Sequence, residues 1–271
     1  MLQHLLPVLF AVFVWWFGTA LVFVLDQLPA RSFRWTMAGA TLVLGVALSG
    51  VVWLAQEQST AAAYAAFACG VLVWAWAEIG LLTGLITGPS HKPCPPGAEG
   101  MERFRAALAT IIHHEIAILV LAALLVVLLW GAPNQVALHT FLVLWVMRQS
   151  AKLNIYLGAR NLGESMLPPH LRHLASYFRE RPMNALFPVS ITGGTVAVIL
   201  LVQQGMGGGE FAVTAGTLLG ALMALAVIEH WFLMLPLPLD GLWTWGRPVA
   251  SPANPAACPQ RVEPARLPLR P

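Results

Sequence analysis

The chain has 271 residues, of which 58% are apolar or aromatic and only 10% are charged. Soluble globular domains average about 25% charged residues, so this composition excludes a soluble enzyme, a disordered chain and a disulfide scaffold. The formal net charge is +3, and the positions of the basic residues explain it without a nucleic-acid partner. We therefore predict an all-α, polytopic integral membrane protein.

Seven stretches are long and apolar enough to cross a bilayer, which takes about 20 residues per helix. The stretch at 135–156 carries charged residues, and the stretch at 186–202 contains Pro188, Gly193 and Gly194, which membrane helices tolerate. The first stretch lacks the basic start of a cleaved signal peptide, so we expect a retained helix. The predicted spans are residues 2–25, 36–55, 61–86, 105–130, 135–156, 186–202 and 210–235.

Basic residues occupy every second connection of this seven-span arrangement. All 15 Lys and Arg residues lie after spans one, three, five and seven or at the span ends beside those connections. The alternate connections at 56–60, 131–134 and 203–209 hold none. Because Lys and Arg mark the cytoplasmic side, we predict that the N-terminus lies outside and the C-terminus in the cytoplasm.

Two segments lie outside the predicted spans. Pro168 and Pro169 would start a helix over 168–181 with apolar residues at i, i+3, i+4 and i+7. We expect an amphipathic helix on the cytoplasmic membrane surface, or alternatively a segment that packs across the bundle. Its residues that would meet partners or lipid head groups are Arg172, Leu174, Phe178 and Arg179. The proline-rich residues 247–271 cannot bury a core, so we predict a disordered tail after a helical domain over 1–246.

Ionisable side chains inside the predicted spans lie at one depth. Each costs about 2.5–3.5 kcal/mol to insert, so each needs a partner or a function. A rise of about 1.5 Å per residue places them at similar levels in the cytoplasmic half, which predicts one shared internal site. They are Glu78 in span three, His113, His114 and Glu115 in span four, Arg148 and Lys152, with Asn154, in span five, and Glu229 and His230 in span seven.

Two interpretations of this site rest on charge and ligand type. In the first, Arg148, Lys152 and Asn154 balance the carboxylates in a network that fixes helix register. In the second, the site binds a metal, because Glu and His ligate di-iron centres in helical bundles. The E-x-x-H spacing is absent, and adjacent residues on a helix diverge by about 100°. The candidate metal ligands are Glu78, His113, His114, Glu115, Glu229 and His230.

Two further interpretations concern transport and pigment. His114 or His230 could be an axial ligand of a tetrapyrrole, with Trp74, Trp76 and Trp231 as flat apolar walls. The same ionisable groups could instead form a proton or ion path.

Several unusual strings in the chain resemble the PuhE-type family of photosynthetic complex assembly proteins. The resemblance extends through Trp245 and leaves out the proline-rich tail. The strings are HHEIAI (113–118), SAKLNIYLGARNLGE (150–164), LPPHLRHLASYFRERPMNALFPVS (167–190) and EHWFLMLPLPLDGLWTW (229–245).

The resemblance implies a multi-pass protein of the bacterial inner, photosynthetic membrane that is associated with reaction-centre genes. It implies a role in assembling reaction-centre and light-harvesting complexes, or in supplying bacteriochlorophyll to them. Expected partners are subunits of those complexes, pigment-synthesis enzymes and lipid, and expected cofactors are bacteriochlorophyll or a precursor rather than a transition metal. The alternatives are a metal-dependent oxidase or tetrapyrrole-modifying enzyme that uses the same Glu and His residues, and a transporter.

Overall fold

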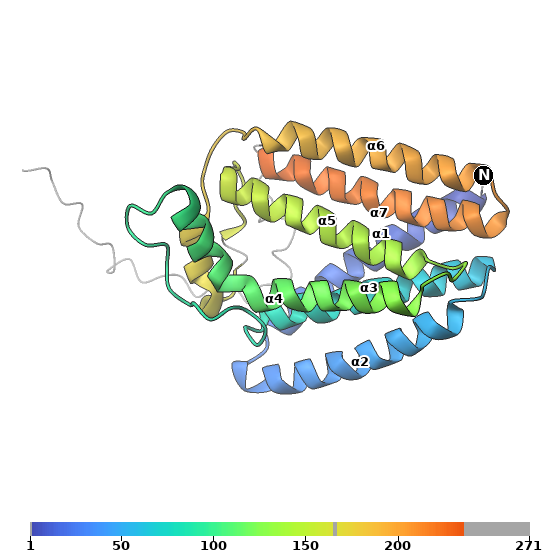
Figure 1. The fold of residues 1–271 in the computed structure, drawn as a ribbon, viewed down its shortest axis with the longest axis horizontal. Helices are drawn as coiled ribbons and strands as arrows, with labels where there is room; N and C mark the ends of the chain where they lie inside the picture. The colour runs from blue at the N-terminus through green and yellow to red at the C-terminus, as the bar shows by residue number, and fades with distance from the viewer. Residues whose placement is uncertain (1, 165–166, 236–271) are drawn as a thin grey trace, which may run out of the picture.

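The computed structural model describes residues 2–164 and 167–235. Within those ranges the chain is an all-helical bundle whose long helices run side by side (Figure 1), which confirms the predicted fold class. The predicted tail at 247–271 lies outside the described residues. The long helices are α1 (Leu2–Asp26), α2 (Phe33–Leu54), α3 (Thr60–Leu82), α4 (Gly100–Leu128), α5 (Val136–Leu157), α6 (Leu186–Met206) and α7 (Glu210–Met234).

Six of these helices are long and apolar enough to span a membrane, so this is a multi-pass membrane protein. Among the long helices that the structure describes, only α5 is not apolar enough, because it carries Arg148, Gln149 and Lys152. Its 22 residues are nevertheless long enough to cross, and it packs against α3 and α7 inside the bundle. The fifth predicted span, at 135–156, is therefore present as a helix that packs against other helices of the bundle.

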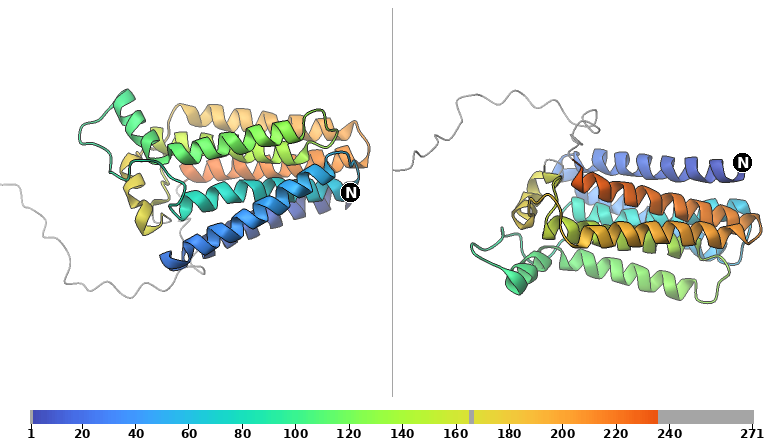
Figure 2. Two further views of the ribbon diagram at one scale, coloured as in Figure 1. Left: turned by 60° about the horizontal axis from the view of Figure 1, so that its bottom comes forward. Right: turned by 90° about the horizontal axis from the view of Figure 1, so that it is seen from above.

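The connections α1–α2, α3–α4 and α5–α6 lie together at the end of the bundle opposite the N-terminus (Figures 1 and 2). We call this the basic end, because the described Lys and Arg residues lie in these connections or in the helix segments next to them. The positive-inside rule predicts that the basic end faces the cytoplasm.

Small residues let neighbouring helices approach closely, as in other membrane bundles. Gly70 of α3 faces α5 so tightly that a Cβ would lie 2.6 Å from the Ala137 carbonyl oxygen. Gly205 of α6 and Gly216 of α7 meet in the same way, with a Cβ on Gly216 only 2.9 Å from the Gly205 Cα. These contacts set the close spacing between α3 and α5 and between α6 and α7.

The segment predicted as a surface α-helix over 168–181 is shorter and of another type. It forms a 3₁₀ helix, η3 (Pro169–Tyr177), that packs across the basic end with Leu171 and Tyr177 buried. A ring nitrogen of His170 donates to the Leu82 carbonyl at 2.8 Å, and the Tyr177 hydroxyl donates to the Lys92 carbonyl at 3.2 Å.

The predicted helix stops early because the following residues pair with another segment. The backbone N–H of Ala159 donates to the Arg179 carbonyl at 3.0 Å, and that of Arg181 donates to the Ala159 carbonyl at 3.0 Å. Arg172 is exposed, whereas Leu174, Phe178 and Arg179 are half-buried. The alternative of packing across the bundle thus describes this segment.

Two histidines meet where η3 lies on the α3–α4 connection. The rings of His91 and His173 have centroids 5.7 Å apart, and Nε2 of His173 is buried without a hydrogen-bond partner. Burial lowers the pKa of His173, and the neighbouring His91 lowers it further. The neutral form of His173 is therefore the one that this packing favours.

Candidate functional site

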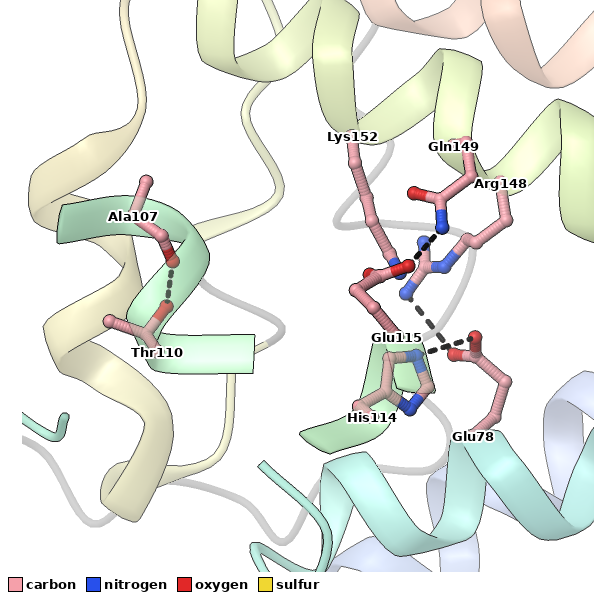
Figure 3. Close-up of polar contacts among 8 residues, drawn as sticks. All are labelled: Glu78, Ala107, Thr110, His114, Glu115, Arg148, Gln149 and Lys152. Atoms are coloured by element: carbon pink, nitrogen blue, oxygen red, sulfur yellow. Dashed lines mark hydrogen bonds and ion pairs between the residues drawn. The ribbon is translucent and has the colours of Figure 1, made fainter. Parts of the chain in front are cut away.

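Ionisable side chains from three helices meet (Figure 3), and the helix bounds place them in the half of the bundle nearer the basic end. Arg148 Nη2 donates to Glu78 Oε2 at 3.3 Å, and Lys152 Nζ donates to Glu115 Oε1 at 2.8 Å. The Gln149 amide donates to the other oxygen of Glu115. We call this group the charged cluster: Glu78 from α3, His114 and Glu115 from α4, and Arg148, Gln149 and Lys152 from α5.

The formal charges of the charged cluster cancel, since two carboxylates face two cations. Glu78 is only 12% exposed, so little solvent screens its pairing, while Arg148 keeps 42% of its side chain exposed. Ionised groups at membrane depth need partners, and here each carboxylate has a cation from α5. The pairs therefore tie α5 to both α3 and α4.

His114 is the member of the charged cluster that has unused hydrogen-bonding capacity. It is fully buried, and neither ring nitrogen has a hydrogen-bond partner. Its Nε2 lies 4.0 Å from Oε1 of Glu78, another buried atom without a partner. That distance is too long for a hydrogen bond. Buried polar groups are nearly always paired, so the two facing atoms mark His114 and Glu78 as functional candidates.

Hydrogen bonds between the α3–α4 connection and the backbone of α4 position His114. Its backbone N–H donates to the Thr87 carbonyl at 3.1 Å, and the Ser90 N–H donates to the Ala109 carbonyl at 3.1 Å. The α3–α4 connection therefore inserts into the helix, a recognised cause of a sharp bend. Gly88 permits this approach, because a Cβ there would come within 2.6 Å of an α4 backbone carbon.

A second group of polar residues lies on the other side of α5 and carries no formal charge when its histidine is neutral. His230 Nδ1 donates to the Ala226 carbonyl at 2.8 Å, so Nε2 can accept from the Ser150 hydroxyl at 2.9 Å. The Ser150 and Ser190 hydroxyl oxygens lie 2.8 Å apart. We call this group the neutral network: His230 of α7, Ser150 and Asn154 of α5, Ser190 of α6 and Asn184 before α6.

Asn184 links the neutral network to the start of α6. Its Nδ2 donates to Asn154 Oδ1 at 3.0 Å and to the Gly158 carbonyl at 2.7 Å, while its Oδ1 accepts from the Leu186 N–H at 2.8 Å. The sequence interpretation missed Asn184, Ser150 and Ser190. An asparagine just before a helix is a known start signal and could have indicated the first of them.

The structure separates the residues that the sequence placed in one shared site. Glu229 accepts from Trp15 Nε1 at 3.1 Å, His113 is exposed, and His230 and Asn154 belong to the neutral network. In the described part of the chain, no three His, Cys, Asp or Glu side chains converge to hold a metal. The reason is that neighbours on a helix diverge by about 100°, so each adjacent pair splits between two directions.

The candidate pigment ligands also face different parts of the bundle. Trp74 packs edge-on against Phe141 of α5 at 5.5 Å between ring centroids, whereas Trp76 Nε1 donates to Thr41 of α2 at 3.0 Å. Both ring nitrogens of His230 are engaged, so it offers no free atom to an axial metal. Of the two candidate axial histidines, only His114 keeps free nitrogens.

Comparisons with other proteins match the whole helical part of the chain. A family model described as a protein of unknown function (DUF3623) matches residues 1–254. A relative from Rhodobacter capsulatus, named "Uncharacterized 30.4 kDa protein in puhA 5'region", is 38% identical over 273 residues, which cover 97% of each chain. No solved structure matches. These matches agree with the PuhE-type resemblance of the sequence.

Proposed function

The chain belongs to the DUF3623 family, and from that premise we propose that it is a membrane assembly factor for the bacterial photosynthetic apparatus. It would act in the inner, photosynthetic membrane on reaction-centre or light-harvesting complexes, or on the supply of bacteriochlorophyll to them. One observation carries the proposal: the full-length relative bears a name that places it in the puhA 5' region.

The charged cluster fits an organising role better than metal-dependent catalysis. Its carboxylates pair with Arg148 and Lys152 rather than lying together as vacant ligands. The enzyme alternative requires Glu229 and His230 beside Glu78, and both have other partners. No observation favours transport.

Within this proposal, His114 is the group that acts, and the paired charges around it hold the helices in register. A buried imidazole that makes no hydrogen bond gains no stability in that way, so its presence needs another reason. We assign it a role in assembly, either in contact with a client or in a change of helix packing that the client induces.

Deletion of the gene in a phototrophic host tests the proposal. Near-infrared absorption of the membranes would report assembled complexes, and chromatography of extracted pigments would report intermediates. We expect fewer assembled complexes, normal transcripts of their subunits and no new pigment intermediate. Accumulation of one intermediate would instead support the enzyme alternative, and unchanged complexes would refute both.

Two adjacent histidines offer a matched pair for complementation. His114→Leu should fail to restore the complexes although the protein accumulates, whereas His113→Leu should restore them, because His113 is exposed. Equal rescue by both variants would contradict the role of His114.

A further inference from the structure

The first turns of α4 leave the direction of the rest of the helix. We call residues 100–109 the α4 arm. Figures 1 and 2 show the arm turned across the bundle axis at the basic end and projecting beyond the edge of the bundle, and Figure 3 shows the turn containing Ala107 and Thr110 set off from the segment with His114. The 29 residues of α4 exceed what a membrane needs. Residues 110–128 alone span about 28 Å, close to the hydrocarbon thickness.

The α4 arm is amphipathic, and its two faces are reversed relative to a helix on a soluble protein. Met101 and Phe104 are 61% and 40% exposed and, with the half-buried Leu108, recur at i, i+3 and i+7. On the opposite face of the arm, Arg103 is buried, and Thr110, directly after the arm, is buried as well. Soluble proteins bury the apolar face of such a helix and expose the polar one. An outward apolar face at this level is typical of an interfacial helix.

Contacts of the buried face hold the α4 arm in this orientation. Arg103 Nη2 donates to the Tyr156 carbonyl at 3.2 Å and also to the Tyr177 carbonyl, and its guanidinium carbon lies 4.0 Å from the Tyr156 ring centroid. The arm is therefore fixed both to α5 and to η3. Fixed contacts on the polar side leave the apolar side aimed away from the protein.

We propose that the α4 arm is an interfacial helix that inserts Met101, Phe104 and Leu108 into the cytoplasmic leaflet. Arg105 is exposed beside this apolar face, where it can meet the phosphate of an anionic phospholipid. The arm lies at the basic end, which carries the charges that anionic lipids attract. The occupant of this surface is thus the head-group region of the bilayer that surrounds the bundle.

Photo-crosslinking of the full-length protein in nanodiscs of phosphatidylethanolamine and phosphatidylglycerol tests the proposal. Met101→Bpa (Bpa is p-benzoylphenylalanine) should yield lipid adducts that mass spectrometry detects. The matched control Glu102→Bpa, one residue further along the exposed arm, should yield few. Equal or absent lipid adducts at both positions would overturn the proposal, and so would adducts at Met101 in native membranes that contain protein instead of lipid.

The contribution of Arg105 has a separate readout. In the Met101→Bpa background, Arg105→Gln should lower the share of phosphatidylglycerol among the lipid adducts by about fivefold, since one basic residue near an anionic surface has an effect of that size. Arg172→Gln is the control, because Arg172 is an exposed arginine of the same end that lies on η3. An unchanged share in Arg105→Gln would overturn the assignment of a phospholipid phosphate to Arg105.

Discussion

The charged cluster and the neutral network lie on two sides of α5, and they solve the burial of polar groups in different ways. In the neutral network, every side chain has a hydrogen-bond partner. In the charged cluster, ion pairs join three helices while His114 stays without a hydrogen bond. The difference indicates that the neutral network serves packing, whereas the charged cluster carries a residue that packing does not explain.

α5 takes part in both regions, so its rotation about its own axis determines both. Arg148 and Lys152 are four residues apart and project toward α3 and α4. Ser150 and Asn154, also four apart, contact the elements on the other side. A rotation of α5 would break the two regions together.

Loss of one ion-pair partner in the charged cluster should have the largest effect on stability. Lys152→Met leaves Glu115 with an amide as its only hydrogen-bond donor, and an uncompensated buried charge costs about 3–5 kcal/mol. Unfolding in mixed micelles should show a decrease of that size in the free energy of unfolding. Lys152→Arg should keep most of the stability, and Glu115→Gln combined with Lys152→Met should regain part of it. An equal loss in all three variants would show that the lysine stem, rather than its charge, matters.

Removal of Asn184 should lower stability through the neutral network. Asn184→Ala deletes hydrogen bonds to α5 and the cap of α6, which together should lower the free energy of unfolding by about 2 kcal/mol. The same micelle assay measures it. Met183→Ala, at an exposed neighbour, should change little, and a comparable loss there would contradict the assignment to hydrogen bonding.

Replacement of the two buried histidines, one in each region, tests whether the neutral network contributes more hydrogen bonding to stability than His114 does. His230→Leu removes two hydrogen bonds and should lower the free energy of unfolding by about 1 kcal/mol. His114→Leu removes none and should leave stability within about 0.5 kcal/mol of the parent, because an apolar side chain of similar size replaces an imidazole that makes no hydrogen bond. Thermal unfolding measures both, and the reverse order would refute the distinction between the two regions.

His173 at the basic end provides a reference outside the membrane and the smallest expected effect. Because its pKa is lowered in the folded protein, the unfolded chain binds the proton more readily. The stability that this neutral histidine contributes is present above about pH 6.5 and declines as the pH falls below that value. His173→Gln should flatten the pH dependence of thermal unfolding in that window, and an unchanged slope would assign the dependence to other groups.

The span pattern could be predicted from the sequence because hydrocarbon thickness sets the length of an apolar run. The span predicted at 61–86 contains most of α3 (Thr60–Leu82), and the one predicted at 210–235 coincides with α7 to within one residue. Basic residues at alternate connections predicted the end of the bundle at which they gather.

The contents of the candidate site could be predicted only in part, because rotation of each helix depends on its neighbours. The sequence identified Glu78, Glu115, Arg148 and Lys152 as residues of similar depth, and depth needs only a count along the helix. The direction in which each side chain points depends on tertiary packing. The sequence therefore could not predict that His230 lies in the neutral network instead of the charged cluster.

The bend of α4 was equally hidden, because a connection that donates into a helix ladder leaves the hydrophobic pattern intact. Gly88 is the residue that allows the close approach of the connection to α4, but a glycine before a helix has many other uses and does not by itself predict a bend. The outward face of the α4 arm depends on that bend. The hydrophobic pattern instead predicts an amphipathic surface helix at 168–181.

The polar character of α5 also constrains how the protein is made. Because α5 is not apolar enough to be stable in lipid by itself, we expect it to enter the bilayer packed against other helices. Of the helices that it contacts, α3 is synthesised before α5 and α7 after it. Ser150 thus meets His230 only after α7 has been synthesised, whereas Asn154 contacts Asn184, which lies just before α6. We therefore expect a nascent chain interrupted before α7 to leave Ser150 without its histidine partner, so that synthesis of α7 completes the packing around α5.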